Sequence, residues 1–290
     1  MKKYFAMLLA GMMVVSLVAC GGSSTASAPA EAPAEAEAEA EAPAEEETTE
    51  AEAPAETTEE TAEMTTVEAG VLHMATNAAF PPYEMISDND GFEGIDVEIA
   101  TEIARKLGLE LVVDDMEFGS VITSVQSGKS DIAMAGLTVT EERKQNVDFT
   151  TSYATGIQVI IVPEDSDILT VDDLANDKMI GVQDGTTGYI YCSDDYGEDH
   201  ITSYTNGAMA IEALKGGKVD AVVIDNEPAR AFVAANDGLK ILDTEYIVEN
   251  YAIGVSKDNP GLCKAVNDAL TELIADGTVQ MIVDKYITAE

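Results

Sequence analysis

The residue best suited to chemistry in this chain is Arg143, at the end of the segment Gly136-Leu137-Thr138-Val139-Thr140-Glu141-Glu142-Arg143. This segment follows a short apolar run and places a guanidinium five residues beyond the hydroxyl of Thr138. The whole chain has only 15 Lys and Arg residues against 55 Asp and Glu residues. Because a guanidinium offers a planar bidentate fork to a carboxylate, we expect Arg143 to capture a small anion of that kind. The alternative is a surface arginine paired with Glu141 or Glu142 on a helix.

The elements that must position Arg143 are those of an α/β protein that begins near Val67. Apolar runs alternate with amphipathic stretches, and an apolar stripe at helical spacing follows Asp96. This alternation predicts open, mainly parallel sheets flanked by helices, with ligands bound at the carboxyl ends of strands. The expected strands are 71–75, 109–113, 132–135, 158–162, 179–182 and 221–224, and the expected helices are 96–107, 121–126, one near 189, 208–214, 228–236, 260–275 and 279–286.

The N-terminus predicts export and lipid anchoring. Lys2 and Lys3 precede an apolar run that is too short to span a bilayer and that ends in Leu17-Val18-Ala19-Cys20. This ending resembles the cleavage box of bacterial lipoproteins, which implies loss of residues 1–19 and diacylation of Cys20. Two acyl chains give stable anchoring. A plain secretory signal peptide with a chance cysteine is the alternative.

Residues 20–66 have the composition of a disordered acidic tether. From 21 to 66 the chain has 14 glutamates, no Lys or Arg, and repeated Ala-Pro and Glu-Ala units. Such a segment cannot bury enough apolar surface to offset the entropy of ordering. At about 3 Å per residue it would reach on the order of 100 Å. This length suits a domain held outside a Gram-positive cell membrane and wall; in a Gram-negative cell the domain would be periplasmic.

The domain that follows the tether is strongly acidic. Removing Lys2, Lys3 and the 14 tether glutamates from the totals leaves 13 basic and 41 acidic residues, a net charge of −28. Nucleic acid and anionic lipid headgroups need basic surface. The charge therefore excludes nucleic acid as a partner but does not identify the ligand.

The ordered part of the chain resembles a known family. Motifs that match in order and spacing are Phe80-Pro81-Pro82-Tyr83-Glu84, Gly94-Ile95-Asp96-Val97-Glu98, Leu137 to Arg143, Val147-Asp148-Phe149, Gly181 to Thr187 and Gly217-Lys218-Val219-Asp220-Ala221. Residues 67–290 look like a polar amino-acid-binding protein of the type II periplasmic solute-binding family, the extracellular receptor of an ABC importer. The resemblance implies lobe 1 from 67–158 and 253–290, lobe 2 from 159–252, and two hinge crossovers between them.

The resemblance also implies roles for individual residues around a bound amino acid. Arg143 would grip the ligand α-carboxylate together with the backbone N–H groups of Thr138 and Thr187. The α-ammonium would meet the Gly136 carbonyl, the Thr138 hydroxyl and the Asp225 carboxylate. Phe80 and Phe118 would sandwich the ligand side chain. Charges that pair in this way leave little unpaired when water is expelled.

Plainer readings of the same residues remain open. Asp225 could cap the helix that contains Pro228, and Phe80 and Phe118 could be ordinary core residues. Thr186 and Thr187 could serve as a helix N-cap. Asp131 and Asp220 precede similar strands, and we expect both to be loop or capping residues.

Asn77 is the one departure from the family pattern. The family often has aspartate there, and asparagine removes a charge that would pair with a cationic ligand. A neutral polar ligand is therefore favoured, with glutamine as the candidate because Gly136, Phe80 and Phe118 resemble glutamine-binding members. Acidic ligands stay open, and Glu84, Gln183 or Asp184 could reach the same pocket.

The remaining cysteines and the histidines point to no further chemistry. The expected lobes separate Cys192 from Cys263, and a disulfide between them would restrain hinge closure, so we expect free thiols. His73 and His200 are isolated, so the sequence predicts no metal site and no cofactor.

A binding receptor is therefore expected rather than an enzyme. The protein would act as a monomer, capture a free amino acid by hinge closure and deliver it to an ABC permease. Two other classes stay open. A secreted dehydratase of the same fold would need an acid or base, for which Asp225 and Glu84 are the only candidates. A sensing protein would signal through a partner.

Overall fold

The computed structural model of this chain describes residues 63–287, which belong to one compact unit. The signal peptide, the lipidation site Cys20 and nearly all of the predicted tether lie outside the described residues. No helix within 63–287 is long and apolar enough to cross a membrane.

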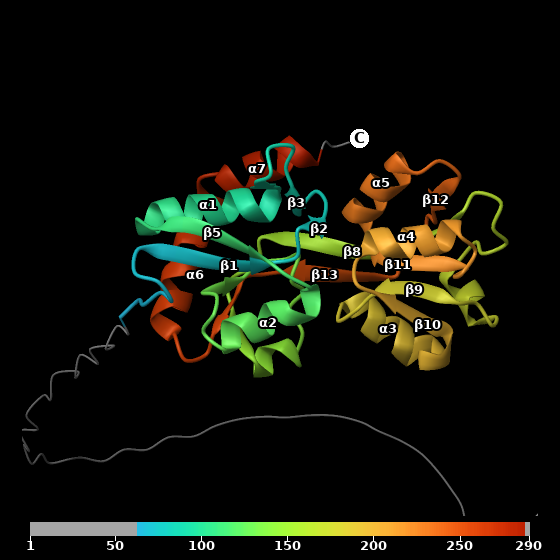
Figure 1. The fold of residues 1–290 in the computed structure, drawn as a ribbon, viewed down its shortest axis with the longest axis horizontal. Helices are drawn as coiled ribbons and strands as arrows, with labels where there is room; N and C mark the ends of the chain where they lie inside the picture. The colour runs from blue at the N-terminus through green and yellow to red at the C-terminus, as the bar shows by residue number, and fades with distance from the viewer. Residues whose placement is uncertain (1–62, 288–290) are drawn as a thin grey trace, which may run out of the picture. The chain divides into compact units, whose positions relative to one another are not determined.

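The first sheet has five strands in the order β5-β1-β6-β14-β7. Strand β1 runs parallel to β5 and β6, whereas β14 runs antiparallel to β6 and β7. Figure 1 shows this sheet with α1, α2, α6 and α7, and we call the group lobe 1. The bounds are β1 Val71–Thr76, β5 Glu110–Asp115, β6 Ile132–Ala133, β7 Val147–Phe149, β14 Gly254–Ser256, α1 Ile95–Leu107, α2 Phe118–Gln126, α6 Pro260–Ala275 and α7 Thr278–Tyr286.

The second sheet has the order β10-β9-β11-β8-β12, and β13 also pairs with β8. It lies beside α3, α4 and α5, and we call this group lobe 2 (Figure 1). The bounds are β8 Ala154–Pro163, β9 Ile180–Gln183, β10 Ile201–Tyr204, β11 Ala221–Asp225, β12 Leu239–Ile241, β13 Ile247–Tyr251, α3 Thr187–Tyr196, α4 Gly207–Lys215 and α5 Asn226–Ala235. A small sheet joins β2 Ala79–Phe80, β3 Glu84–Ile86 and β4 Phe92–Glu93, and short 3-10 turns cover Arg143–Gln145, Val171–Ala175 and Glu198–His200.

The predicted α/β alternation is confirmed, but both sheets are mixed rather than mainly parallel. The strands joined by helical crossovers, β1, β5 and β6 in one sheet and β9, β10 and β11 in the other, run parallel. Strands β12 and β13 pair with β8 antiparallel, and β14 enters lobe 1 after β13 has ended in lobe 2. Antiparallel neighbours need no helical crossover. The alternation of helices and strands in the sequence therefore does not predict β12, β13 and β14.

Helix α1 shows how the sequence builds one of these elements. Its apolar stripe is buried, its first turn carries Asp96 and Glu98, and its last turn carries Arg105 and Lys106. Acidic residues at the N-terminus and basic residues at the C-terminus complement the helix dipole. The helix ends at Gly108, whose φ of 71° is favourable only for glycine.

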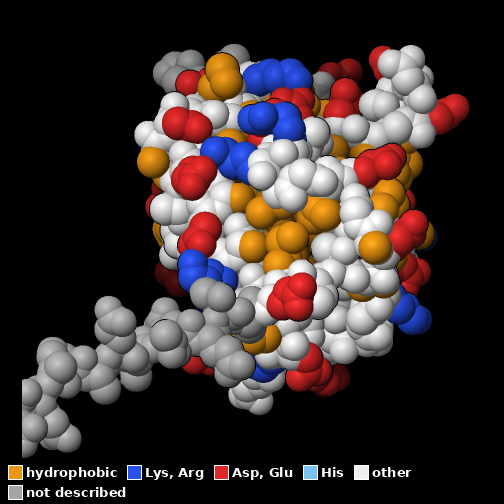
Figure 2. Space-filling view, turned by 90° about the vertical axis from the view of Figure 1, so that its left-hand side faces the viewer, with side chains coloured by type: hydrophobic (Ala, Val, Ile, Leu, Met, Phe, Trp, Pro, Cys, Tyr) orange, Lys and Arg blue, Asp and Glu red, His pale blue; other side chains and the backbone are white. Residues whose placement is uncertain are grey.

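Most of the few cations lie in surface ion pairs. Lys106 pairs with Glu272 at 2.9 Å, and Lys257 pairs with Asp148 at 2.8 Å. Figure 2 shows one face on which basic and acidic side chains surround a group of apolar ones. Exposed pairs of this kind contribute little to stability, so the exceptional cation is the buried one, Arg143.

Cys192 and Cys263 are free thiols, as predicted. Between residues 63 and 287, no group of three or more His, Cys, Asp or Glu side chains is arranged to hold a metal ion.

Candidate functional site

All eight residues predicted to bind a ligand line one pocket. Asn77, Phe80, Phe118, Gly136, Thr138 and Arg143 come from the lobe 1 part of the chain, whereas Thr187 and Asp225 belong to lobe 2. The pocket is also lined by Glu84, Ala135, Gln183 and Thr186. Segments far apart in the sequence therefore meet around one pocket.

Arg143 is buried, with 7% of its surface exposed. Its guanidinium donates to the carbonyl oxygens of Thr138 at 2.8 Å and Gly185 at 3.2 Å, and it lies 5.4 Å from the ring centroid of Phe118. Burial lowers the pKa of Arg143. Glu141, one of its two expected surface partners, pairs with Lys144 instead. Among the described residues no carboxylate forms an ion pair with Arg143, so the surface salt-bridge reading is wrong.

Gly136 occupies a position that only glycine fits well. Its φ is 52°, and a Cβ there would lie 2.7 Å from Cε1 of Phe80. Its N–H donates to Asp96 Oδ2 at 2.8 Å. Asp96, within the quoted helix motif, thus fixes the backbone that precedes Thr138.

Asp225 lies at the end of β11, directly before α5, and is 8% exposed. It occupies the N-cap position of α5, but its side chain makes no capping hydrogen bond. Instead it accepts hydrogen bonds from Gln158 Nε2 at 2.8 Å and from the Tyr251 hydroxyl. Burial, and then the charge of Glu249, raise the pKa of Asp225 to about 7. The helix-cap reading therefore does not account for this carboxylate.

Thr186 and Thr187, at the start of α3, both line the pocket. Thr186 is the N-cap, and its hydroxyl accepts from the N–H of Tyr189 at 3.3 Å. Thr187 is the first helical residue and is buried. Since the first N–H groups of a helix have no partner within the helix, an anion can bind there. The capping reading therefore applies to Thr186 and leaves Thr187 available.

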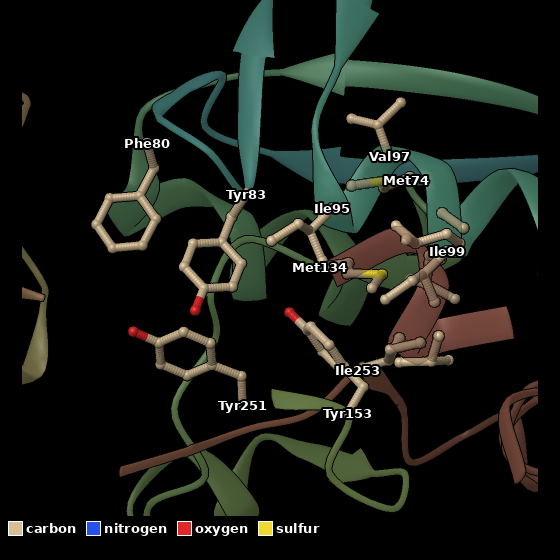
Figure 3. Packing of buried hydrophobic residues seen from close by; sticks show 14 of the residues in the cluster. Met74, Phe80, Tyr83, Ile95, Val97, Ile99, Met134, Tyr153, Tyr251 and Ile253 are labelled. Carbon is tan, nitrogen blue, oxygen red and sulfur yellow. The ribbon is translucent and has the colours of Figure 1, made fainter. Parts of the chain in front are cut away.

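The two predicted aromatic residues line the pocket in different ways. Phe80 is buried and stacks on Tyr83, with ring centroids 5.9 Å apart. Phe118 is half-buried and begins α2. Figure 3 shows Phe80 beside Tyr83, and the hydroxyls of Tyr83 and Tyr251 approaching each other. Phe80 is therefore both a core residue and part of the pocket wall.

Asn77 forms a hydrogen bond between the lobes. Its Nδ2 donates to the Met116 carbonyl at 2.8 Å, and its Oδ1 accepts from Gln183 Nε2 of β9 at 2.9 Å. Three other side chains were expected to reach the pocket beside Asn77. Glu84 and Gln183 do line it, whereas Asp184 lines a neighbouring pocket.

Several buried residues of this region were not singled out as site residues from the sequence. Glu249 of β13 is 3% exposed and accepts from the Thr138 hydroxyl at 3.2 Å and from Gln158 Nε2 at 3.0 Å. Gln158 therefore bridges Glu249 and Asp225. The sequence offered one signal for Glu249, because a carboxylate stands inside the strand-forming run Ile247–Tyr251.

The two aspartates expected to cap loops do so. Asp131 accepts from the N–H groups of Val67 and His73, each at 2.8 Å, and Asp220 accepts from the N–H of Met179 at 2.8 Å. Neither aspartate lines the pocket.

Comparisons with known proteins cover the whole of this region. A model of the bacterial extracellular solute-binding proteins, family 3, matches residues 72–289. The chain is 31% identical over 220 residues to ABC transporter arginine-binding protein 1 of Escherichia coli K12, covering 74% of this chain and 90% of that protein. It is 28% identical over 302 residues to the arginine-binding extracellular protein ArtP of Bacillus subtilis, covering 100% of both.

A solved structure, an ancestral arginine-binding protein bound to glutamine, matches with a TM-score of 0.73 and 37% identity, covering 77% of this chain and 100% of that one. The predicted two-lobed fold is thereby confirmed. The family match includes every residue that lines the pocket.

Proposed function

The chain belongs to the family 3 bacterial extracellular solute-binding proteins, and from that membership we propose that it captures one free amino acid in the Arg143–Asp225 pocket and delivers it to an ABC permease. The ligand's α-carboxylate binds the Arg143 guanidinium and the N–H groups of Thr138 and Thr187. Its α-ammonium binds Asp225, the Thr138 hydroxyl and the Gly136 carbonyl.

The observation that carries this proposal is a buried cation and a buried anion on one small pocket. Arg143 is 7% exposed and Asp225 is 8% exposed. Within the part of the chain that the structure describes, Arg143 has no paired carboxylate and Asp225 has no paired cation. Each charge is costly to bury alone. A zwitterion compensates both, and micromolar affinity requires only about 8 kcal/mol.

The side chain of the ligand is polar and neutral in this proposal, with glutamine as the first candidate. Asn77 and Gln183 contribute amide groups to the pocket in place of a charge. The ancestral relative was solved with glutamine, whereas the Escherichia coli and Bacillus subtilis relatives are named for arginine. Arginine is therefore the comparison that any test must include.

Hinge closure is the proposed mechanism of capture. The proposed boundaries of the moving lobes are 67–158 with 253–290, and 159–252. The first crossover then lies within β8, which was grouped with lobe 2 above, and the second directly follows β13. Support comes from two hydrogen bonds that already join the lobes, Gln183 to Asn77 and Arg143 to the Gly185 carbonyl. The protein works as a monomer, and the closed form is the one that docks on the permease.

Anchoring through Cys20 completes the proposal. Residues 1–19 act as a signal peptide, and the acidic tether holds the domain outside the cell. Labelling of cells with a radioactive fatty acid will mark the wild-type protein and leave Cys20→Ser unmarked. Equal labelling of both would contradict the anchor.

A thermal-shift screen of the purified domain against the twenty common amino acids tests the function, since a ligand that binds only the folded state raises the melting temperature. Arg143→Ala should strongly reduce every shift measured at the same ligand concentration. The matched control is Arg105→Ala, since Arg105 is an exposed arginine paired with Glu102. This variant should show the same thermal shifts as the wild type. No shift with any amino acid would overturn the proposal. Formation of a new product from the bound compound would favour the enzyme reading instead.

A further inference from the structure

Glu84 is a pocket residue whose charge the proposed function does not use. It begins β3, is 0% exposed and lines the pocket. Among residues 63–287, no group donates a hydrogen bond to either of its carboxyl oxygens. A buried carboxylate with no donor is costly, so this side chain needs either a proton or a cation.

Asp96 supplies the missing partner. Its Oδ2 accepts from the N–H of Gly136 and from the Tyr153 hydroxyl, both at 2.8 Å. Its Oδ1 is buried and has no donor either. The carboxyl groups of Glu84 and Asp96 lie within hydrogen-bonding reach of each other. One proton between them would satisfy the orphaned oxygen of Asp96 and one oxygen of Glu84.

The groups that act most strongly on Glu84 are other carboxylates. Carboxylates act on Glu84 from α1 (Asp96), from the end of β11 (Asp225) and from the end of β5 (Asp115). The charge of Glu84 also acts on two buried tyrosines, Tyr83 and Tyr153, and helps to raise the pKa of each. Figure 3 shows these two tyrosines in the buried cluster. Burial, followed by the charge of Asp96, raises the pKa of Glu84 well above its usual range, and burial also raises the pKa of Asp96. Asp96 accepts hydrogen bonds from the Gly136 N–H and the Tyr153 hydroxyl, which stabilise its carboxylate, whereas Glu84 has no such donor among the described residues. The proton therefore belongs on Glu84, which donates to Asp96.

We propose that Glu84 and Asp96 share one proton at neutral pH and that this acid pair makes the pocket favour a neutral ligand side chain over a cationic one. The proposal rests on the proposed function, because it assigns a specificity device to the same site. A neutral amide can bind against the Glu84 carboxyl without any change in protonation.

A cationic side chain meets a different requirement. To pair with Glu84 it must first remove the shared proton, which leaves for solvent as the carboxyl becomes a carboxylate. Binding of a cation therefore releases one more proton than binding of a neutral analogue. As pH rises this release becomes easier, so affinity for the cation should rise relative to affinity for the neutral ligand by up to about tenfold per pH unit.

Infrared spectroscopy of the ligand-free protein at pH 7 tests the shared proton directly. The wild type should show the C=O band of a protonated carboxyl, and Glu84→Gln should lose that component. Glu93→Gln is the matched control, since Glu93 is an exposed glutamate of β4 in the same small sheet. An unchanged protonated-carboxyl band in Glu84→Gln would overturn the proposal without bearing on whether the protein binds amino acids.

Titration calorimetry tests the consequence for the ligand. Arginine and glutamine are each titrated in two buffers of different ionisation enthalpy, which gives the number of protons released. Arginine should release about one proton more than glutamine, and this excess should vanish in Glu84→Gln. Any proton released by Asp225 cancels, because both ligands carry the same ammonium group.

The outcomes separate this proposal from the proposed function. Equal proton release by the two ligands, or an arginine-to-glutamine affinity ratio that is constant from pH 6 to pH 9, would overturn the acid pair while leaving amino-acid binding intact. Failure of arginine to bind at pH 9 as well as at pH 7 would also overturn it. Failure of both ligands and of all other amino acids would overturn the proposed function itself.

Discussion

At the scale of single residues, the site is defined by two opposite charges that are almost fully buried. Arg143 is held by two carbonyl oxygens and a ring, and Asp225 by an amide and a hydroxyl. None of these partners neutralises its charge. Each group is thus oriented while its charge remains available to a ligand.

The first prediction concerns the fork geometry of Arg143. Arg143→Ala should weaken binding by about 2–5 kcal/mol, which corresponds to roughly 30-fold or more, because a buried carboxylate loses its partner. Arg143→Lys should recover only part of that loss, since lysine lacks the bidentate fork. Calorimetric titration with the ligand found in the screen measures both. Full affinity in the lysine variant would show that charge alone suffices.

The second prediction follows from the pKa of Asp225, which burial raises to about 7. Only the ionised form attracts an ammonium, so affinity should fall by up to tenfold per unit as pH drops below 7. In the ligand-free protein the raised pKa has the opposite consequence. The folded state holds the proton more tightly than the unfolded state, so this contribution to stability is present below about pH 4 and is lost as pH rises through 7.

Melting curves and titrations between pH 5 and pH 8 measure both effects. In Asp225→Asn the contribution of this group to the pH dependence of melting should disappear. A wild-type affinity independent of pH over this range would contradict the assignment of Asp225 to the ammonium.

At the scale of elements, strands β8 and β13 hold the buried polar network behind the pocket. Gln158 lies on β8, Glu249 and Tyr251 lie on β13, and Gly156 pairs with Glu249 in the ladder. A Cβ at Gly156 would lie 2.1 Å from the Tyr251 hydroxyl and 2.6 Å from Asp225 Oδ1. The absence of a side chain at Gly156 therefore leaves room for the network that orients Asp225.

The third prediction tests this close approach. Gly156→Ala should lower the melting temperature and weaken ligand binding, because the methyl group displaces Tyr251 or Asp225. Overpacking of this kind typically lowers the free energy of unfolding by about 1–3 kcal/mol. Gly119→Ala is the matched control, since a Cβ at Gly119 would meet nothing within 4 Å and helix α2 should tolerate alanine well. Thermal melts and ligand titrations of both variants test this prediction. Equal melting temperatures and equal affinities in the two variants would contradict the packing argument.

At the scale of the whole domain, side chains from two lobes enclose the pocket. The Gln183–Asn77 bond joins β9 of lobe 2 to the segment after β1 of lobe 1. A ligand that contacts both lobes shifts the population toward the closed form. The same hydrogen bond should favour that form.

The fourth prediction is a change in compactness. Small-angle X-ray scattering should show a smaller radius of gyration when the ligand is added to the wild type. Gln183→Ala should need more ligand for the same change, whereas Gln126→Ala, which removes an exposed hydrogen bond to Asn146, should behave as the wild type does. A radius that ligand leaves unchanged would contradict hinge closure.

Asn77→Asp provides the fifth prediction, on ligand preference. A carboxylate at this position restores a charge that a cationic side chain can pair with, so arginine should gain affinity relative to glutamine. Competition between the two ligands, measured by the melting temperature of wild type and variant, checks the ratio. A gain for glutamine instead would contradict the role given to Asn77.

Much of this architecture was accessible from the chain itself. The apolar stripe and dipole charges of α1 predicted a helix over 96–107, and the structure begins it one residue earlier. The motif resemblance predicted eight residues around one ligand, and all eight line one pocket in the structure. By contrast, β2 and β4 are only two residues long, and so short a strand leaves no periodicity to detect.

The sequence by itself determined the α/β alternation, the family and the residues around the pocket, because these depend on local periodicity and on motifs that lie within short stretches of chain. Only the tertiary structure decided that Arg143 is buried, that Asp225 is bound by Gln158 rather than capping α5, and that Glu84 faces Asp96. The physical reason is that burial and charge pairing depend on distances between segments far apart in the chain. Spacing along the sequence does not encode those distances.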